Sequence, residues 1–171
     1  MTTLSVLEFN SPDGADQALR ILQRLQQQQL IKLVDAAVVS WPQSSKGPKT
    51  KQMVSTARAG AIGGAFWGFL IGLIFFVPLL GFAVGAATGA VTGALNDYGI
   101  DDNFIKQVRE KVKPGTSALF LMTAHAVIDR VVAELKSLNP ELITSNLSDE
   151  QESRLRELFT EGQIADAQTT T

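Results

Sequence analysis

Hydrophobic and polar positions follow two different patterns along this 171-residue chain. In both flanks, apolar residues recur at the spacings typical of strands and helices, with charged residues between them. Between Arg58 and Asp97, by contrast, there is no Asp, Glu, Lys or Arg. This charge-free stretch is nearly twice the roughly 20 residues that one membrane-spanning helix requires. Because Pro78 lies close to its centre, the pattern predicts two apolar helices separated by a break.

Eight glycines in this stretch recur at every fourth position, four on each side of Pro78. Residues four apart share one face of a helix, so each set forms a stripe against which another helix can pack closely. A glycine in a helix interior costs roughly 1 kcal/mol relative to alanine, so two such registers indicate a packing function. We predict a glycine-zipper hairpin over residues 53–97 that turns at Pro78. The predicted helix-packing and oligomerisation residues are Gly60, Gly64, Gly68, Gly72, Gly81, Gly85, Gly89 and Gly93.

The segment from Phe76 to Gly81 contains no polar side chain, although a hairpin that crosses a bilayer normally exposes a hydrophilic turn. Two helices of about 18 residues each reach about 27 Å, slightly less than the roughly 30 Å hydrocarbon core. Three placements therefore stay open, namely a spanning hairpin, a re-entrant wedge and the buried core of an oligomer. Trp67 lies inside the charge-free stretch, and we expect it to pack against lipid or another helix.

The first 52 residues predict a β-α-β unit. Leu4 to Phe9 has strand character, and Asp13 is the expected N-cap of the helix that follows. Leu33 to Trp41 is expected to be a second strand, with Asp35 pointing to solvent, and a lysine-bearing loop follows it. The expected core face of the helix consists of Ala15, Ala18, Leu19, Leu22 and Leu25.

Residues 98–161 predict an α-β-α-β-α unit. Asp101 or Asp102 is expected to cap the first helix, and Pro114 and Gly115 to stop it. The remaining elements are a strand at Ser117 to Thr123, a helix through Val127 to Leu138, a strand at Leu142 to Ser145 and a helix that opens at Ser148. Residues 162–171 are expected to form a flexible tail.

Neither flank alone buries its apolar faces, so we expect the two to combine into one α+β sandwich interrupted by the hairpin. A hairpin returns the chain to the side it left, which such a combination requires. Lysines and arginines flank the insertion on both sides, so both termini are expected on the cytoplasmic side of the inner membrane. Candidate contacts to lipid headgroups are Lys46, Lys49, Lys51 and Arg58.

Composition excludes several function classes. The net charge is only -2, which does not favour nucleic-acid binding. Cysteine is absent and His125 is the one histidine, so the usual metal-ligand sets lack members. The N-terminus has no basic segment followed by an apolar one, and a cleavable secretory signal is not expected. We therefore predict no catalytic, cofactor or metal site and no enzyme activity.

Several motifs resemble the bacterial family of domain of unknown function 1269. They are Leu30 to Val39, Lys51-Gln52, the double glycine zipper, and Leu142 to Ser148 before an acidic helix. The resemblance covers nearly the whole chain. It implies a predicted membrane protein with a glycine-zipper insert in a ferredoxin-like frame, sometimes associated with stress genes, and it supplies no catalytic residues.

These features predict a non-enzymatic membrane protein that self-associates through its zipper, acting as a scaffold or membrane-shaping module with the α+β part as a cytoplasmic platform. Its expected partners are membrane lipids, further copies of the chain and an unidentified cytoplasmic protein. One alternative is an oligomeric pore for uncharged solutes, because no ionisable residue lies within the stretch. The other is a soluble oligomer that buries its hairpins and binds a ligand or partner through the α+β domain.

Overall fold

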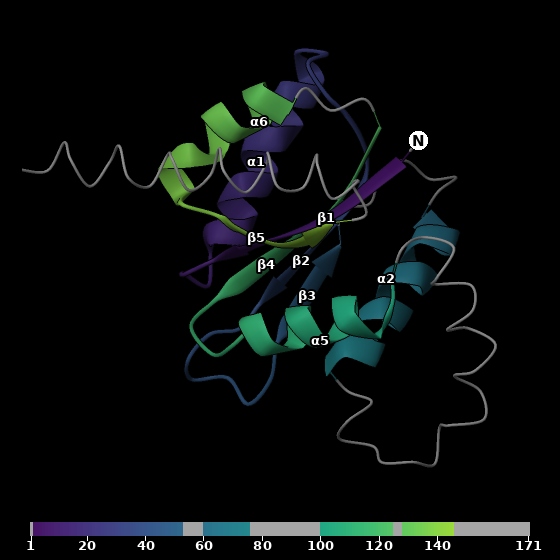
Figure 1. Cartoon of the computed structure of the whole chain (residues 1–171), viewed down its shortest axis with the longest axis vertical. Coiled ribbons are helices and arrows are strands. Elements are labelled where there is room, and N and C mark those ends of the chain that lie inside the picture. The colour runs from purple at the N-terminus through teal and green to yellow at the C-terminus, as the bar shows by residue number, and fades with distance from the viewer. Residues whose placement is uncertain (1, 53–59, 76–99, 125–127, 146–171) are drawn as a thin grey trace, which may run out of the picture.

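The computed structural model describes residues 2–52, 60–75, 100–124 and 128–145 (Figure 1). In this part of the chain one antiparallel sheet has the strand order β3-β2-β4-β1-β5. Its strands are β1 (Thr2–Phe9), β2 (Lys32–Ser40), β3 (Lys49–Gln52), β4 (Ser117–Ala124) and β5 (Glu141–Ser145). The helices are α1 (Gly14–Gln27), α2 (Gly60–Phe75), α5 (Asp102–Lys111), α6 (Ile128–Leu135) and the short 3-10 helix η2 (Lys136–Leu138). An α+β class with strands from both flanks in one sheet was predicted, and the structure confirms it.

Helices cover both faces of the sheet, with α1 and α6 on one side and α2 and α5 on the other (Figure 1). Strand side chains alternate between the faces. Leu7 of β1 points to the α1 side, and its neighbour Val6 points to the α2 side. The same alternation holds for Leu119 and Phe120 of β4. Apolar residues on both faces explain why β4 contains a continuous hydrophobic run from Ala118 to Met122.

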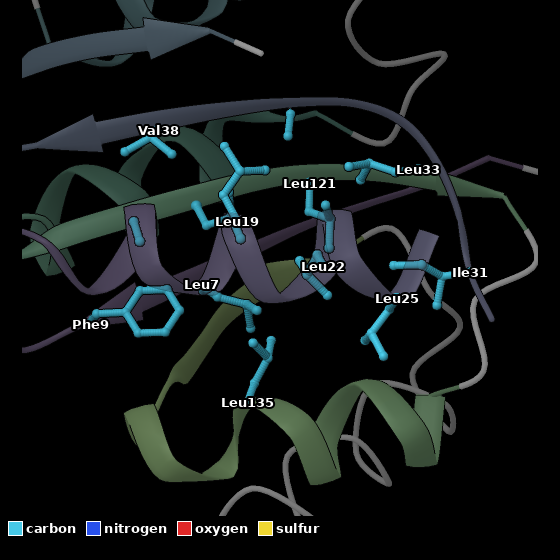
Figure 2. Close-up of a cluster of buried hydrophobic side chains, with 14 of the residues drawn as sticks. Leu7, Phe9, Leu19, Leu22, Leu25, Ile31, Leu33, Val38, Leu121 and Leu135 are labelled. Atoms are coloured by element: carbon cyan, nitrogen blue, oxygen red, sulfur yellow. The ribbon is translucent and has the colours of Figure 1, made fainter. Parts of the chain in front are cut away.

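The core beneath α1 consists of leucines from the helix and side chains from four strands, as Figure 2 shows. Every residue of the predicted core face of α1 is buried. Leu135 of α6 belongs to the same cluster and points from α6 towards Leu7 and α1 (Figure 2). A helical face read from its 3.6-residue spacing is therefore confirmed.

The N-terminus of α1 is held by a residue distant in sequence. Asp13 occupies the predicted N-cap position, but its side chain makes no capping hydrogen bond and instead accepts one from Gln17. The Ser117 hydroxyl of β4 accepts a 2.9 Å hydrogen bond from the backbone N–H of Ala15. It also donates a 2.7 Å bond to the carbonyl of Ser11, so one buried hydroxyl ties β4 to the start of α1.

Two local expectations have different outcomes. Asp101 caps α5 as predicted, since its Oδ1 accepts a 2.8 Å hydrogen bond from the backbone N–H of Phe104. The lysine-bearing loop after β2 was expected to be irregular, and this was wrong for residues 49–52. They form β3, a short edge strand that pairs with Ala37–Ser40. Lysines are common on edge strands because their charge discourages pairing with other chains.

Candidate functional site

The junction of α2 with the sheet and α5 is the most informative part of the structure. Four apolar side chains of α2 are at most 3% exposed, and they fall at helical positions i, i+3, i+4 and i+7. They pack against sheet residues such as Phe120 and against α5 residues such as Val108. The four are Trp67, Leu70, Ile71 and Ile74. Truncating a side chain buried to this degree typically costs about 2–5 kcal/mol, so α2 is part of the domain core in this conformation.

A bulge in β2 aims a carboxylate at α2. The register with β4 shifts between Leu33 and Asp35, so the strand contains one extra residue there. Val34 is left 38% exposed, and Asp35 turns to the α2 side of the sheet. Its Oδ2 accepts a 2.8 Å hydrogen bond from the indole Nε1 of Trp67. The expectation that Asp35 points to solvent was wrong.

Trp67 packs against the sheet of its own chain in this conformation. Its ring meets that of Phe120 edge-on, with centroids 6.0 Å apart and an interplanar angle of 71°. Edge-to-face pairs of this kind stabilise aromatic cores. Phe120 and Asp35 of the sheet are therefore partners of Trp67 in this conformation, and residues of α5 such as Val108 lie in the same cluster. Packing against another helix had been expected, whereas these contacts with the sheet had not.

Arg109 of α5 binds the last described turn of α2. Its Nε donates a 2.7 Å hydrogen bond to the carbonyl of Ile74, and its Nη2 donates a 3.3 Å bond to the carbonyl of Leu73. A cation near carbonyl groups at the C-terminal end of a helix also interacts favourably with the helix dipole. The Phe75 ring meets Trp41 edge-on at 6.4 Å, which adds an aromatic contact at the same end of α2.

Gly68 and Gly72, the two glycines of α2 whose surroundings the structure describes, face away from this junction. Gly60 and Gly64 lie in the first half of α2, and Gly68 and Gly72 in the second half. A Cβ atom placed on Gly68 or Gly72 meets no atom of the described residues within 4 Å. Pro78 and the four glycines after it lie outside the described residues. Within the described ranges, no helix is long and apolar enough to span a bilayer.

The predicted headgroup-binding lysines lie at one edge of the sheet. Lys46 is exposed in the loop before β3, and Lys49 and Lys51 are exposed on β3 itself. Lys51 pairs directly with Val38 across the strands, and its Nζ lies 3.3 Å from Asp16 of α1. It therefore faces the α1 side of the sheet, opposite the face that α2 covers. Arg58 lies outside the described residues.

A charge cluster lies at the other edge of the sheet. Glu8 of β1 is buried and stands directly opposite Glu141 of β5. Burial raises the pKa of Glu8 and the neighbouring Glu141 charge raises it further, while Lys111 and Lys113 act in the opposite direction. The Lys111 ammonium lies 2.6 Å from a carboxylate oxygen of Glu141. This arrangement makes the edge sensitive to pH.

The rest of the described surface has a hollow but no metal site. A hollow at the C-terminal end of α1 is lined mainly by polar and aliphatic side chains, namely Gln26, Gln29, Leu30, Ile31 and Lys32. Across the described ranges, no group of three or more histidine, aspartate or glutamate side chains is arranged to hold a metal ion.

Comparison with known proteins places the chain in a family. The model of the family described as "Protein of unknown function (DUF1269)" matches residues 61–160, more than half of the sequence. The chain belongs to the DUF1269 family. The DUF1269 match begins just after the start of α2 and includes α5, β4, α6 and β5. No curated protein and no solved structure gives a significant match.

The family assignment confirms the resemblance over residues 61–160, whereas the motifs Leu30 to Val39 and Lys51-Gln52 lie before the match. The function of the family is unknown. The DUF1269 match includes two members of the junction, Trp67 and Arg109, whereas Asp35 lies before it. Sequence reasoning did not single out Arg109 as a partner of α2. Its position on an otherwise ordinary amphipathic helix gives no local signal of that contact.

Proposed function

We propose that this protein is a non-enzymatic, membrane-associated module that self-associates through its glycine-zipper segment and presents the α+β domain as a platform. The carrying observation is the charge-free stretch from Ala59 to Asn96 with two four-glycine registers. The outward position of Gly68 and Gly72 supports the proposal, because this face of α2 is open to another helix. Membrane lipids and further copies of the chain are the proposed partners.

The strand order of the α+β domain supports our proposal that the domain is a ferredoxin-like frame. When the edge strand β3 is set aside, the strands follow the order β2-β4-β1-β5, and α1 and α6 connect or flank them on one face. This is a β-α-β-β-α-β arrangement. The α2 and α5 segment is inserted between β2 and β4, which are its second and third strands in sequence. We propose that the insertion is the membrane-associated part and that the frame lies on the cytoplasmic side of the inner membrane.

Fractionation of cells that express the full chain tests membrane association. We expect the protein to stay with the membranes during an alkaline carbonate wash and to be released as an oligomer by mild detergent. Release by carbonate alone would limit the contact to the membrane surface, and recovery in the detergent-free soluble fraction would contradict the proposal.

Charge removal at β3 tests the proposed lipid headgroup contacts. Replacing Lys46, Lys49 and Lys51 by glutamine should weaken binding to anionic vesicles at least about tenfold, since each lysine near such a surface contributes about 1 kcal/mol. The matched control replaces three cations elsewhere, namely Arg20, Lys32 and Lys106. Equal losses in both triple variants would show that net charge alone, and no local contact, determines binding.

A second candidate is favoured by the way α2 packs. The side chains of Trp67, Leu70 and Ile74 are buried against the sheet and α5, as is typical of a helix that covers the core of a domain in water. In this alternative, a soluble oligomer buries the remaining apolar surface of the segment between copies. A large, homogeneous particle that forms without detergent would favour it over the membrane-associated form.

A further inference from the structure

We propose that Asp35 and Arg109 form a polar latch that holds α2 on the sheet and that must open before α2 enters a bilayer. This inference rests on the membrane-associated function proposed above. The latch consists of the Asp35 bond to Trp67 and the Arg109 bonds to the carbonyls of Leu73 and Ile74. The latch keeps α2 on the domain, whereas the apolar residues of α2 alone would favour its entry into a bilayer.

Both charged members of the latch belong to the domain and neither belongs to α2. α2 has no charged residue, so each tether pairs a neutral group of α2 with an ion on β2 or α5. Hydrogen bonds to ions are stronger than those between neutral groups. Opening the latch therefore leaves α2 uniformly apolar, and Asp35, which is half-buried, becomes as accessible to water as the exposed Arg109 already is.

The docked position and a membrane-spanning position exclude each other. Ile74 lies about 21 Å along the helix from Gly60, since each residue adds about 1.5 Å. An α2 that enters a bilayer near Gly60 would carry Ile74 about two-thirds of the way across the roughly 30 Å hydrocarbon core. Arg109 cannot follow, because α5 also bears Lys106, Glu110 and Lys111, and charged side chains are very unfavourable in hydrocarbon. The bonds at Leu73 and Ile74 must therefore break.

The bulge in β2 places the Asp35 carboxylate where it can hold α2 in the docked position. It turns Asp35 to the α2 side of the sheet, which regular strand alternation from Leu33 would not do. Release of α2 uncovers apolar strand residues such as Val6 and Phe120, so the docked state is the resting state in water. A lipid bilayer offers α2 another apolar environment and shifts the population towards the released state.

The test compares two double variants of the full chain that change the same charges. The latch variant carries Asp35→Ala and Arg109→Gln, and the control carries Glu110→Ala and Lys106→Gln, an exposed pair on α5 with its charges 3.9 Å apart. Hydrogen exchange without lipid reports the docking of α2. Flotation with neutral phosphatidylcholine vesicles reports membrane entry without a contribution from surface charge.

We expect the latch variant to show about tenfold faster exchange in α2 and an about tenfold higher ratio of vesicle-bound to free protein than the control, as the loss of a charge-assisted hydrogen bond predicts. Exchange in α1 and β4 should not change. Unchanged α2 exchange, or equal binding of variant and control to the vesicles, overturns the latch. No vesicle binding by any form, including the unmodified chain, overturns the membrane-associated function and the latch with it.

If the double variant loses its fold, exchange in α1 and β4 will rise as well. Trp67→Phe then replaces it, because phenylalanine keeps an aromatic ring next to Phe120 and removes only the donor to Asp35. The same two readouts apply, with the unmodified chain as the control. Faster α2 exchange and stronger vesicle binding than in the control support the latch, and the absence of either effect overturns it.

Discussion

The indole Nε1 of Trp67 donates a 2.8 Å hydrogen bond to Oδ2 of Asp35 and so joins the middle of α2 to the bulged end of β2. The donor residue is only 1% exposed, whereas the acceptor is half-buried. Asp35 Oδ1 accepts a second bond from the backbone N–H of Ala36, so the carboxylate is held in position from its own strand. A buried aromatic side chain thus has a fixed polar partner at the point where α2 crosses the sheet.

We predict that Trp67→Phe lowers the free energy of unfolding by about 1.5–3 kcal/mol, the contribution of a hydrogen bond to a charged group. Urea unfolding followed by circular dichroism measures this change. Trp41→Phe is the matched control, because the Trp41 indole donates a longer 3.2 Å bond to the backbone carbonyl of Ser45 and is only half-buried. A larger loss in the control than in Trp67→Phe would show that the bond to Asp35 is not important for stability.

Ser117 gives a prediction about the α1 terminus. Its buried hydroxyl satisfies both the N–H of Ala15 and the carbonyl of Ser11. Ser117→Ala leaves these two backbone groups without their partner, and we expect a loss of about 2 kcal/mol or more in the free energy of unfolding. Asp13→Ala should cost much less, since the Asp13 side chain makes no capping bond to the helix. Thermal unfolding of the two variants provides the comparison, and the reverse order would mean that Asp13 is the functional cap.

The strands and α1 could be predicted because their signals are local. The leucines of α1 repeat with the period of a helix, β1 is rich in apolar residues from Leu4 to Phe9 and is followed by turn residues, and β4 contains a continuous apolar run. Ser117 could not be recognised as a cap, because the group that it satisfies lies 102 residues away in sequence. β3 was missed because a four-residue segment with two lysines has no apolar alternation.

The orientation of α2 could not be predicted for a different physical reason. The helix is apolar all round, so its sequence does not distinguish the face that meets the sheet from the face that meets another environment. The bulge at Val34 has a similar effect on β2, since a shift by one residue exchanges the two faces of a strand. Sequence reasoning therefore found the segment and its glycine register but misplaced Asp35.

The edge cluster predicts a pH-dependent stability. Burial and the Glu141 charge raise the folded-state pKa of Glu8 above its ordinary value of 4.5. A raised pKa means that the stabilising contribution of protonated Glu8 is fully present below about pH 4.5 and is lost as the pH rises through the folded-state value. Glu8→Gln removes this titration, so we expect it to stabilise the protein at pH 7 and to have little effect at pH 4.

Denaturant unfolding of Glu8→Gln at both pH values measures this difference. Glu110→Gln serves as the control, because Glu110 is exposed on α5 whereas Glu8 is buried in β1. We expect it to change stability by less than about 0.5 kcal/mol at either pH. A Glu8→Gln variant that is less stable than the unmodified protein at pH 7 would contradict the assigned direction of the pKa shift.

The open glycine face gives the prediction that bears most directly on assembly. Since a Cβ atom on Gly68 or Gly72 meets nothing within 4 Å among the residues that the structure describes, Gly68→Ala and Gly72→Ala should leave the fold of one subunit intact. Each should even favour the helix by about 1 kcal/mol, as alanine does relative to glycine. If another helix packs closely on this face, however, the added methyl groups separate the two backbones. We therefore expect the double variant to form a smaller or weaker oligomer in mild detergent while α2 becomes more helical.

Gly115→Ala is the control for this experiment, because it should affect the stability of the subunit and not its assembly. Gly115 has a φ of +89° in the turn before β4, and a Cβ atom there lies 3.0 Å from the Gln43 amide. Its replacement should lower the stability of the subunit by about 1 kcal/mol or more without changing oligomer size. Light scattering coupled to size-exclusion chromatography measures assembly, and thermal unfolding measures the subunit. If Gly68→Ala with Gly72→Ala keeps the native oligomer size, close packing through this stripe of α2 is wrong, and assembly must use another surface.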